Sequence, residues 1–421
     1  WKRAMKRVIS LYLPSWPTDR LRRMAGDKAP AADTPLIVVG RDGAKRLVTA
    51  ADAAAISLGI RAGMPAAKAQ ALVAGLTVRD ADPVGDAEAL ERLALWILQR
   101  VAPIVAADHP NGIVIDSTGA DHLHGGEVAM LDGLLGRLAM SGIEARAAIA
   151  DTWGAAHALA RHAARPTFIA SPGHGADVIA PLPIEALRLP PTMPGELRML
   201  GFERVSDLLA QPRAPLALRF GPELGRRLDE ALGRSAEPIA PIRPDELVEA
   251  RRVFAEPISA AETIARYTAK LVGALCAALE AKGQGARRLD LICQRVDSRA
   301  QAVRIGMARP TRDAKRITRL LCDKIETIDP GFGIETMTLC ATIAEPLDVR
   351  QAITSLIDEA EPDISDLIDT LANRVGERAI YRAAPVASDV PERSVCRVPA
   401  LAPDTGAGWP DAWPRPARLF L

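Results

Sequence analysis

The sequence predicts a multidomain protein of the α/β (α+β) class. The chain has 421 residues, of which 48% are hydrophobic and 25% charged, a composition typical of globular proteins. Apolar runs of strand length alternate with stretches whose apolar residues recur at helical spacing. Two segments rich in Pro or Gly, 166–194 and 238–244, interrupt this alternation. We therefore expect several α/β modules joined by linkers.

Strands and helices alternate through the first 165 residues. The apolar run at 7–13 predicts a buried strand, and a short basic helix follows the prolines that end it. The helix at 86–101 is the clearest, with Leu90, Leu93 and Ile97 on one stripe. Further strands are expected at 35–40, 46–50, 103–108, 112–117 and 144–150, and further helices at 51–59, 65–75, 126–141 and 152–163.

The second half of the chain predicts two more modules. Residues 194–233 read as short helices separated by Gly and Pro. The elements after residue 245 are a strand at 248–256, a helix at 258–283, strands at 287–297 and 300–308, a helix at 311–328 and a strand at 334–344. This β-α-β-β-α-β order is that of the ferredoxin-like split βαβ arrangement. Such a sheet carries both helices on one face, and we expect the other face to be free.

Composition argues against several classes of protein. Lys and Arg number 53 and Asp and Glu 52, so no global excess of charge indicates a nucleic-acid or membrane partner. Aromatic residues make up only 4%, which disfavours binding of single strands by stacked bases. The five Cys residues lack CxxC spacing, which is typical of reduced cytoplasmic thiols and disfavours a zinc site. No apolar run is long enough for a membrane-spanning helix.

The near-neutral total conceals two segments of opposite charge. Residues 251–324 carry 16 Lys and Arg against 7 Asp and Glu, a net charge of +9. Residues 345–369 carry eight acids and one Arg, a net charge of −7. The cations predict either a groove that follows a phosphate backbone or an ordinary solvated surface. The candidate DNA-binding residues are Arg251, Arg252, Arg287, Arg288, Arg304, Arg309, Arg312, Lys315 and Arg316.

Five segments, in this order, resemble Y-family translesion DNA polymerases. PLIVVG followed by LGIRAGMPAAKAQAL is similar to the fingers, GIVIDSTGADHL to the second palm motif, and GIEARAAIADTWGAAHALARHA to the next palm strand and helix. GFERVSDLLA with LRFGPELGRRLDEALG is similar to the helix-hairpin-helix thumb, and the basic module to the little finger. The resemblance implies a palm-like region at 1–24 and 83–165, a fingers-like region at 25–82, a thumb-like helical module at 166–238, a little finger at 245–345 and a C-terminal linker or partner-binding region at 346–421.

The metal ligands that the resemblance implies are missing. Polymerases use two Mg²⁺ ions held by clustered carboxylates. The family carries one Asp on the first strand and an adjacent Asp-Glu pair in the second palm motif. Ser10 stands at the first position, and Asp116 is followed by Ser117 instead of Glu. Because one carboxylate cannot hold two magnesium ions, we expect no catalytic residue and no metal.

The contacts to the incoming triphosphate are missing as well. The family's fingers Tyr and Arg fall at Ala53 and Ile56, and its palm Lys falls near His157. Shifting the alignment to restore one group of ligands breaks the other. The sequence therefore predicts a pseudoenzyme, a polymerase scaffold without polymerase chemistry, with no cofactor.

Three segments of the sequence resemble one subgroup of this family in particular. ISLYLPSWPTDRL, IDSTGADHLHGGE and VPERSVCRVPAL are similar to the inactive Y-family-like subunit of a bacterial mutagenesis cassette. This resemblance implies a non-catalytic, DNA-binding adaptor in DNA repair, translesion synthesis and damage-induced SOS mutagenesis. The implied partners are DNA, the sliding clamp, a C-family error-prone polymerase and a RecA-like accessory protein. The implied location is the cytoplasm, at the nucleoid.

A candidate clamp-binding peptide follows the little finger. Gln351, Leu356 and Ile357 offer the Gln and apolar side chains that such peptides use, although Ile replaces the usual aromatic residue and the spacing is irregular. The start of an amphipathic helix is an equally good interpretation of the same residues.

Two other functions are compatible with the sequence. A divergent Y-family polymerase would use Asp116 with other acids such as Asp121 or Asp151. A simple DNA-binding module would have no protein partner. His122 and His124 form an HxH pair, which is more often a surface pair than a metal site when no further ligand lies nearby.

Overall fold

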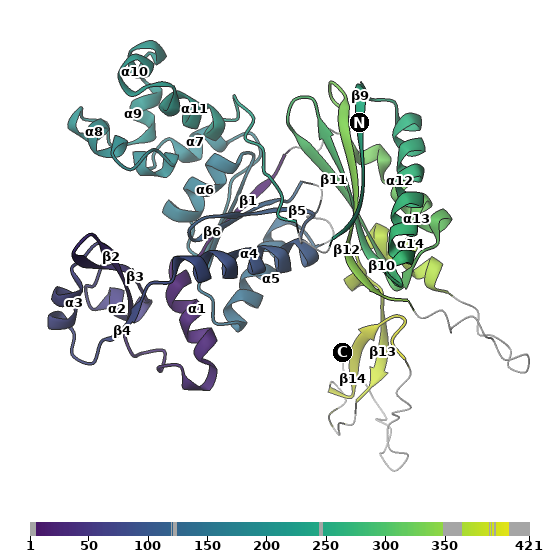
Figure 1. The fold of residues 1–421 in the computed structure, drawn as a ribbon, viewed down its shortest axis with the longest axis horizontal. Coiled ribbons are helices and arrows are strands. Elements are labelled where there is room, and N and C mark those ends of the chain that lie inside the picture. The colour runs from purple at the N-terminus through teal and green to yellow at the C-terminus, as the bar shows by residue number, and fades with distance from the viewer. Residues whose placement is uncertain are drawn as a thin grey trace, which may run out of the picture. The chain divides into compact units, whose positions relative to one another are not determined.

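The computed structural model describes residues 6–118, 120, 124–243, 247–347, 364–386, 388, 390 and 393–403. The chain forms two compact units, Trp1–Asp245 and Glu246–Leu421 (Figure 1). The first unit contains two sheets and a group of short helices. The second contains a four-stranded sheet, its helices and a β-hairpin.

A five-stranded sheet forms the centre of the first unit. Its order is β5-β6-β1-β7-β8, and the middle strand β1 pairs antiparallel with both neighbours. The strands are β1 (Val8–Tyr12), β5 (Ile104–Asp108), β6 (Gly112–Asp116), β7 (Arg146–Ala150) and β8 (Thr167–Ile169). Sequence patterns predict the first four. They do not predict β8, which has only three residues and lies in a Pro- and Gly-rich segment.

Helices cover both faces of this central sheet. Successive residues of a strand point to opposite faces, and Ile9 and Leu11 enter a core shared with α4 (Pro83–Arg100) and α5 (Glu127–Met140). The other face, to which Ser10 belongs, lies against α6 (Trp153–His162), which contacts β1 and β7. Residues 154–160 of α6 are all buried and mostly Ala or Gly. Small side chains let this helix lie close to the strands.

A smaller, three-stranded sheet lies between residues 36 and 80. Its order is β3-β2-β4, antiparallel between β2 and β3 and parallel between β2 and β4. Its elements are β2 (Leu36–Asp42), β3 (Lys45–Ala51), α2 (Ala53–Ser57), α3 (Ala66–Leu72) and β4 (Thr77–Asp80). The Asp52 carboxylate caps α2 and also pairs with Arg22 of α1 (Trp16–Ala25), which joins that helix to the sheet. The short, polar β4 is not predicted from the sequence.

Short helices complete the first unit. They are α7 (Gly175–Ile179), α8 (Met193–Met199), α9 (Val205–Leu209), α10 (Arg213–Phe220) and α11 (Pro222–Ala231). Gly201, Pro212 and Gly221 separate them, as the sequence predicts, whereas Pro215, also expected to be a separator, lies in the first turn of α10. α11 packs on α6, and the Thr152 hydroxyl before α6 donates to the Ala231 carbonyl at 2.8 Å. This contact connects the short helices to the central sheet.

The second unit confirms the predicted β-α-β-β-α-β order. Its elements are β9 (Val248–Ile258), α12 (Ala261–Ala281), β10 (Gln284–Arg295), β11 (Ala300–Thr311), α13 (Ala314–Cys322) and β12 (Ile334–Pro346). The antiparallel sheet has the order β11-β10-β12-β9, so β9 and β10 run parallel with β12 between them. This is a split βαβ unit. Both helices share one core with the sheet, through residues such as Leu275, Ile317 and Leu291.

The face of this sheet opposite α12 and α13 is buried at its centre, whereas Glu249 and Arg251 of β9, on the same face, are exposed. That the face is free therefore stays a prediction. Asp290, Thr338 and Cys340 lie on it and are 0%, 1% and 3% exposed. Arg304 reaches across from β11 and donates two hydrogen bonds to Asp290, at 2.7 and 2.8 Å. Alternation along a strand tells which residues share a face, but it does not tell what lies over them.

Residues 364–403 contain a helix and a hairpin, in the region expected to be a linker. α14 (Ser365–Val375) packs against β11 and α13. β13 (Tyr381–Pro385) and β14 (Val395–Pro399) pair antiparallel (Figure 1). Part of the acidic segment therefore belongs to the fold of the second unit.

Candidate functional site

Ser10, the residue expected to replace the first metal-binding Asp, occupies the middle of β1. Its cross-strand neighbours are Val114 and Ala148. The residue is 0% exposed, and its hydroxyl has no hydrogen-bond partner among the described residues. A neutral hydroxyl between apolar neighbours cannot replace the carboxylate that Mg²⁺ requires.

Asp116 ends β6 opposite Val8, two residues beyond the partner of Ser10. Because alternate residues share a face, Ser10 and Asp116 lie on the same face but are offset along the strands. The Asp116 carboxylate accepts a hydrogen bond from the Thr118 N–H at 3.0 Å, and burial raises its pKa. Within the described residues this carboxylate is not part of any group of three or more His, Cys, Asp or Glu side chains that could hold a metal ion.

Arg7 organises the residues at this end of the sheet. The Ser117 hydroxyl donates to the Arg7 carbonyl at 3.1 Å and is therefore held by the backbone. The buried Arg7 guanidinium donates to Glu127 at 2.5 and 2.9 Å and to Asp151 at 2.8 Å. Asp151, an acid that a divergent polymerase would use, is thus already paired with a cation. Asp121, the other such acid, lies outside the described residues.

A second polar cluster lies at the opposite end of β1, and sequence patterns did not predict it. Gly112 of β6 lies between its two cross-strand partners, Tyr12 on β1 and Asp108 on β5. The Arg161 guanidinium lies 4.8 Å from the Tyr12 ring centroid and 3.5 Å from the Asp108 carboxylate. The His157 Nε2 atom lies 3.7 Å from the same carboxylate. A Cβ at position 112 would lie 2.8 Å from Arg161 Nη2, so Gly leaves room for the guanidinium.

Burial determines the charges in this second cluster. It lowers the pKa of His157 to about 2, and the nearby Arg161 and Arg188 add to the effect, so the imidazole is neutral at pH 7. Burial also lowers the pKa of Arg161, whose Nη1 atom has no hydrogen-bond partner among the described residues. The cluster therefore offers a guanidinium and a neutral imidazole beside a single carboxylate. His157 and Arg161 are four residues apart on α6, a spacing that could have revealed the pair.

The expected triphosphate positions do not form a common site. Ala53 and Ile56 belong to α2, which packs on β2 and β3, and both side chains are exposed. His157 belongs to α6 and is buried against Asp108. None of the three offers a cation to a phosphate.

No group of three or more His, Cys, Asp or Glu side chains in the described part of the chain is arranged to hold a metal ion. His124 lies 3.2 Å from the Val101 carbonyl through its Nε2 atom, and its neighbour in the HxH pair, His122, lies outside the described residues.

The nine candidate DNA-binding residues divide into two groups. Five are bound to other groups: Arg287 to the Met307 carbonyl, Arg288 to Glu377, Arg304 to Asp290, Arg312 to the Gln284 carbonyl and Arg316 to Asp369. Arg251, Arg252, Arg309 and Lys315 are exposed, and Arg252 lies 5.8 Å from the Tyr267 ring. Within the described part of the chain, no ion pair of these four exposed cations would have to break for them to meet a phosphate backbone.

Two known bacterial proteins share much of this sequence. Over 365 residues the chain is 47% identical to the protein ImuB of Caulobacter vibrioides strain NA1000 / CB15N, a match that covers 86% of this chain and 79% of that protein. ImuB of Caulobacter vibrioides strain ATCC 19089 / CIP 103742 / CB 15 matches equally. The chain belongs to the ImuB family. Identity at this level over most of both chains implies a shared fold.

Two family models match different parts of this ImuB-family chain. The impB/mucB/samB family model matches residues 26–161, and the model of its C-terminal domain matches residues 248–353. The first match includes the three-stranded sheet and most of the central sheet, and the second includes the β-α-β-β-α-β module. The chain therefore contains both Y-family polymerase-like domains, and the predicted fold class is confirmed.

Solved polymerase structures show a more distant similarity. DinB from Sulfolobus solfataricus is 16% identical with a TM-score of 0.46, over 80% of this chain and 98% of that chain. An insertion ternary complex of Dbh DNA polymerase is 15% identical with a TM-score of 0.47, over 79% and 98% of the two chains.

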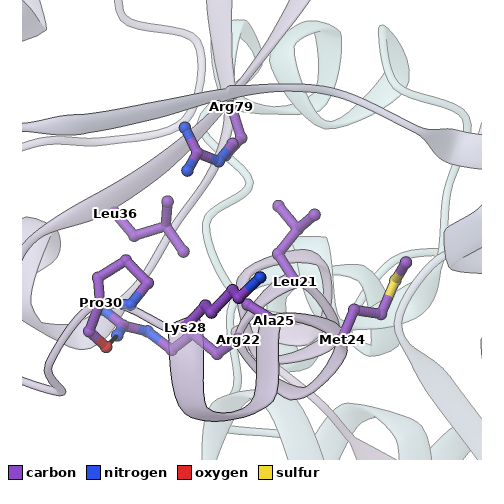
Figure 2. A pocket seen from close by; sticks show the side chains of 8 residues that line it. All are labelled: Leu21, Arg22, Met24, Ala25, Lys28, Pro30, Leu36 and Arg79. Carbon is purple, nitrogen blue, oxygen red and sulfur yellow. Dashed lines mark hydrogen bonds between the residues drawn. The ribbon is translucent and has the colours of Figure 1, made fainter.

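A shallow pocket of about 290 Å³ opens beside α1, on the three-stranded sheet of the ImuB-family chain (Figure 2). Its lining is Leu21, Arg22, Met24, Ala25, Lys28, Pro30, Leu36 and Arg79. Arg22 is held by the Pro30 and Ala31 carbonyls and by Asp52. The lining contains no acid, His or Cys, so this pocket offers no side-chain ligand of the usual kinds to a metal ion.

Two further predictions concern clamp binding and membrane insertion. Gln351, Leu356 and Ile357, the candidate clamp-binding residues, lie outside the described residues. Among the described helices, none is both long and apolar enough to cross a membrane.

Proposed function

We propose that this ImuB-family chain is a non-catalytic, DNA-binding adaptor. In this proposal it recruits an error-prone polymerase and an accessory protein to the sliding clamp during translesion synthesis and damage-induced mutagenesis. The observation that carries the proposal is Ser10, a buried, neutral residue under α6 at the position where phosphoryl transfer needs a metal-binding carboxylate.

The other acids near β1 do not compensate for this loss. Asp151 is paired with Arg7, and Asp108 lies within reach of Arg161 at the far end of β1. A guanidinium beside a carboxylate supplies charge but cannot polarise a phosphoryl oxygen and activate a nucleophile as a metal ion does. Both ends of β1 are therefore organised around internal cation–carboxylate contacts.

DNA contact is proposed for the second unit, whose β-α-β-β-α-β module we propose to act as the little finger. Arg251, Arg309 and Lys315 are exposed cations on two strands and one helix of this unit. Contacts of this kind bind phosphates without reading sequence, which suits an adaptor that must act at any lesion. Such a protein would work at the nucleoid.

The partners are proposed from the resemblance to ImuB. They are the sliding clamp, a C-family error-prone DNA polymerase and the RecA-like ImuA. Gln351, Leu356 and Ile357 are the proposed clamp-binding residues, in the segment that follows β12. An adaptor of this kind would hold DNA with its little finger and leave synthesis to the recruited polymerase.

Primer extension tests the absence of catalysis. The full chain should not extend a primer on undamaged or damaged template, with Mg²⁺ or with Mn²⁺, because β1 carries no metal-binding carboxylate. The Asp116→Ala variant should behave as the parent does, and Asp132→Ala, on the exposed surface of α5, serves as its matched control. Template-dependent extension that Asp116→Ala abolishes and Asp132→Ala retains would establish the divergent polymerase instead.

A further inference from the structure

α14 is an amphipathic helix that exposes its apolar face and packs with its polar face. Amphipathic helices of globular proteins normally bury their apolar stripe. Ile364, Leu367, Leu371 and Val375 follow one another at helical spacing along α14, yet their side chains are between 40% and 59% exposed. The face that contacts β11 and α13 is polar instead, and Ile368 is the large apolar residue buried there.

Two polar side chains attach α14 to the open edge of β11. The Asn373 side chain accepts a hydrogen bond from the Gly306 N–H at 3.0 Å and donates one to the Gly306 carbonyl at 2.8 Å. Asp369 accepts one from the Ala308 N–H at 2.6 Å. These side chains satisfy backbone groups that an edge strand otherwise presents to solvent.

Two carboxylates of α14 also neutralise cations of α13. Asp369 is 1% exposed and pairs with Arg316, which is one of the candidate DNA-binding residues. Asp366 pairs with Arg319 and lies 3.3 Å from Arg316. Arg316 also donates to the Ser365 hydroxyl at 3.1 Å. The acidic segment therefore meets the basic module within the same unit.

The donors gathered under α14 are those that recognise phosphates. Arg guanidinium groups bind carboxylates and phosphates in the same bidentate geometry, and backbone N–H groups are common phosphate donors. We propose that Arg316, Arg319 and the Ala308 N–H form a phosphate-binding surface that the carboxylates of α14 occupy in this structure, and that a nucleic-acid backbone competes with α14 for it. The inference rests on the proposed DNA binding of the second unit.

The way α14 is held makes this competition feasible. Its attachment is mainly ionic and polar, and its apolar stripe contributes little because it faces solvent. Ionic contacts weaken with salt and exchange readily for other anions. A helix held by its apolar face would not respond to a polyanion in this way. DNA binding and release of α14 should therefore be coupled.

The test compares variants of the full chain by fluorescence anisotropy with a primer–template duplex. In Asp366→Asn/Asp369→Asn the competing charges are gone, while the amide introduced at position 369 keeps an acceptor for the Ala308 N–H. DNA binding should tighten about tenfold at moderate salt, with a steeper dependence on salt concentration. Glu262→Gln/Glu280→Gln, on the exposed surface of α12, changes net charge equally and should have a much smaller effect.

A charge-neutral variant and a direct readout complete the test. Asn373→Ala removes the attachment to Gly306 without altering charge, and it should also tighten DNA binding. Hydrogen exchange in α14 and at Gly306 should accelerate when DNA is added to the parent chain. The inference would be overturned if the parent chain bound DNA without faster hydrogen exchange in α14 and if the α14 variants bound DNA no more tightly than the α12 control. The proposed DNA contact would then remain intact. Failure of every variant to bind DNA would overturn both.

Discussion

Two buried side chains of the first unit respond to burial in opposite directions. Asp19 has its pKa raised to about 6 by burial, a change that the hydrogen bond from the Glu144 N–H opposes only in part. His157 has its pKa lowered to about 2 by burial. Burial disfavours the charged form in each case, which is the deprotonated acid for Asp19 and the protonated imidazole for His157. Their contributions to stability therefore change oppositely as the pH falls.

Lowering the pH from 7 to 4 should stabilise the first unit of the parent chain relative to that of an Asp19→Asn variant. Its pKa rises from 3.8 in the unfolded chain to about 6 in the folded one, so its contribution is complete below pH 3.8 and is lost as the pH rises through 6. Between pH 7 and pH 4 the unfolding free energy of the parent should rise relative to Asp19→Asn by about 1 to 2 kcal/mol, after allowance for screening. Chemical denaturation at several pH values measures the difference, and parallel curves would contradict it.

Helix packing in the first unit depends on one small residue. Gly154 of α6 lies against α11, and a Cβ placed on it would be 2.8 Å from the Ala231 Cα and 3.1 Å from the Ala231 N. The first distance is shorter than real Cβ contacts and the second is tighter than most of them, and both atoms belong to the backbone. The approach of α11 to α6, and hence of the short helices to the central sheet, therefore requires Gly at this position.

Gly154→Ala should destabilise the first unit by about 1 to 3 kcal/mol, because the added methyl group forces two helices apart. Gly136→Ala is the matched control. Gly136 lies in the interior of α5 with open space around it, so Ala there should stabilise by about 0.5 to 1 kcal/mol through helix propensity. Thermal unfolding followed by circular dichroism would show the opposite signs. Equal effects of the two substitutions would mean that α11 does not pack on α6 as closely as described.

Neutrality of the whole molecule results from opposed local charges that meet in the second unit. The basic module is followed by an acidic segment, and α14 brings two of its acids onto Arg316 and Arg319. Arg304 is likewise committed to Asp290, which is fully buried. Removing Arg304 would leave a buried charge unpaired and cost stability, so its loss cannot report on DNA binding alone.

The salt dependence of DNA binding should depend on the exposed cations. The variant Arg251→Gln/Arg309→Gln/Lys315→Gln should reduce the slope of log affinity against log salt concentration by about one for each phosphate that is no longer neutralised. The control Arg266→Gln/Lys270→Gln/Lys282→Gln removes three exposed cations associated with α12. A salt titration by anisotropy measures both slopes. If both variants lower the slope equally, the positive charge of the second unit attracts DNA only at long range, without specific phosphate contacts by Arg251, Arg309 and Lys315.

Sequence patterns predicted the local elements well and the site only in part. Hydrophobic periodicity located β1, α6 and all six main elements of the second unit, because these segments bury one face. It did not locate β4 and β8, which are short and partly exposed. Ser10 was identified through the family resemblance. Asp108 and Arg161 were not, since they are 53 residues apart and meet only when β5 lies near α6.

The sequence by itself determined that this is a multidomain α/β chain of the Y-family type, without a carboxylate on its first strand and with a basic module before an acidic segment. These features lie within short stretches, where the residues themselves fix periodicity and charge. Only the tertiary structure decided which charges meet: Arg161 with Asp108, Arg7 with Asp151, and Arg316 with Asp369. Such pairs depend on the packing of elements distant in sequence, which no local pattern encodes.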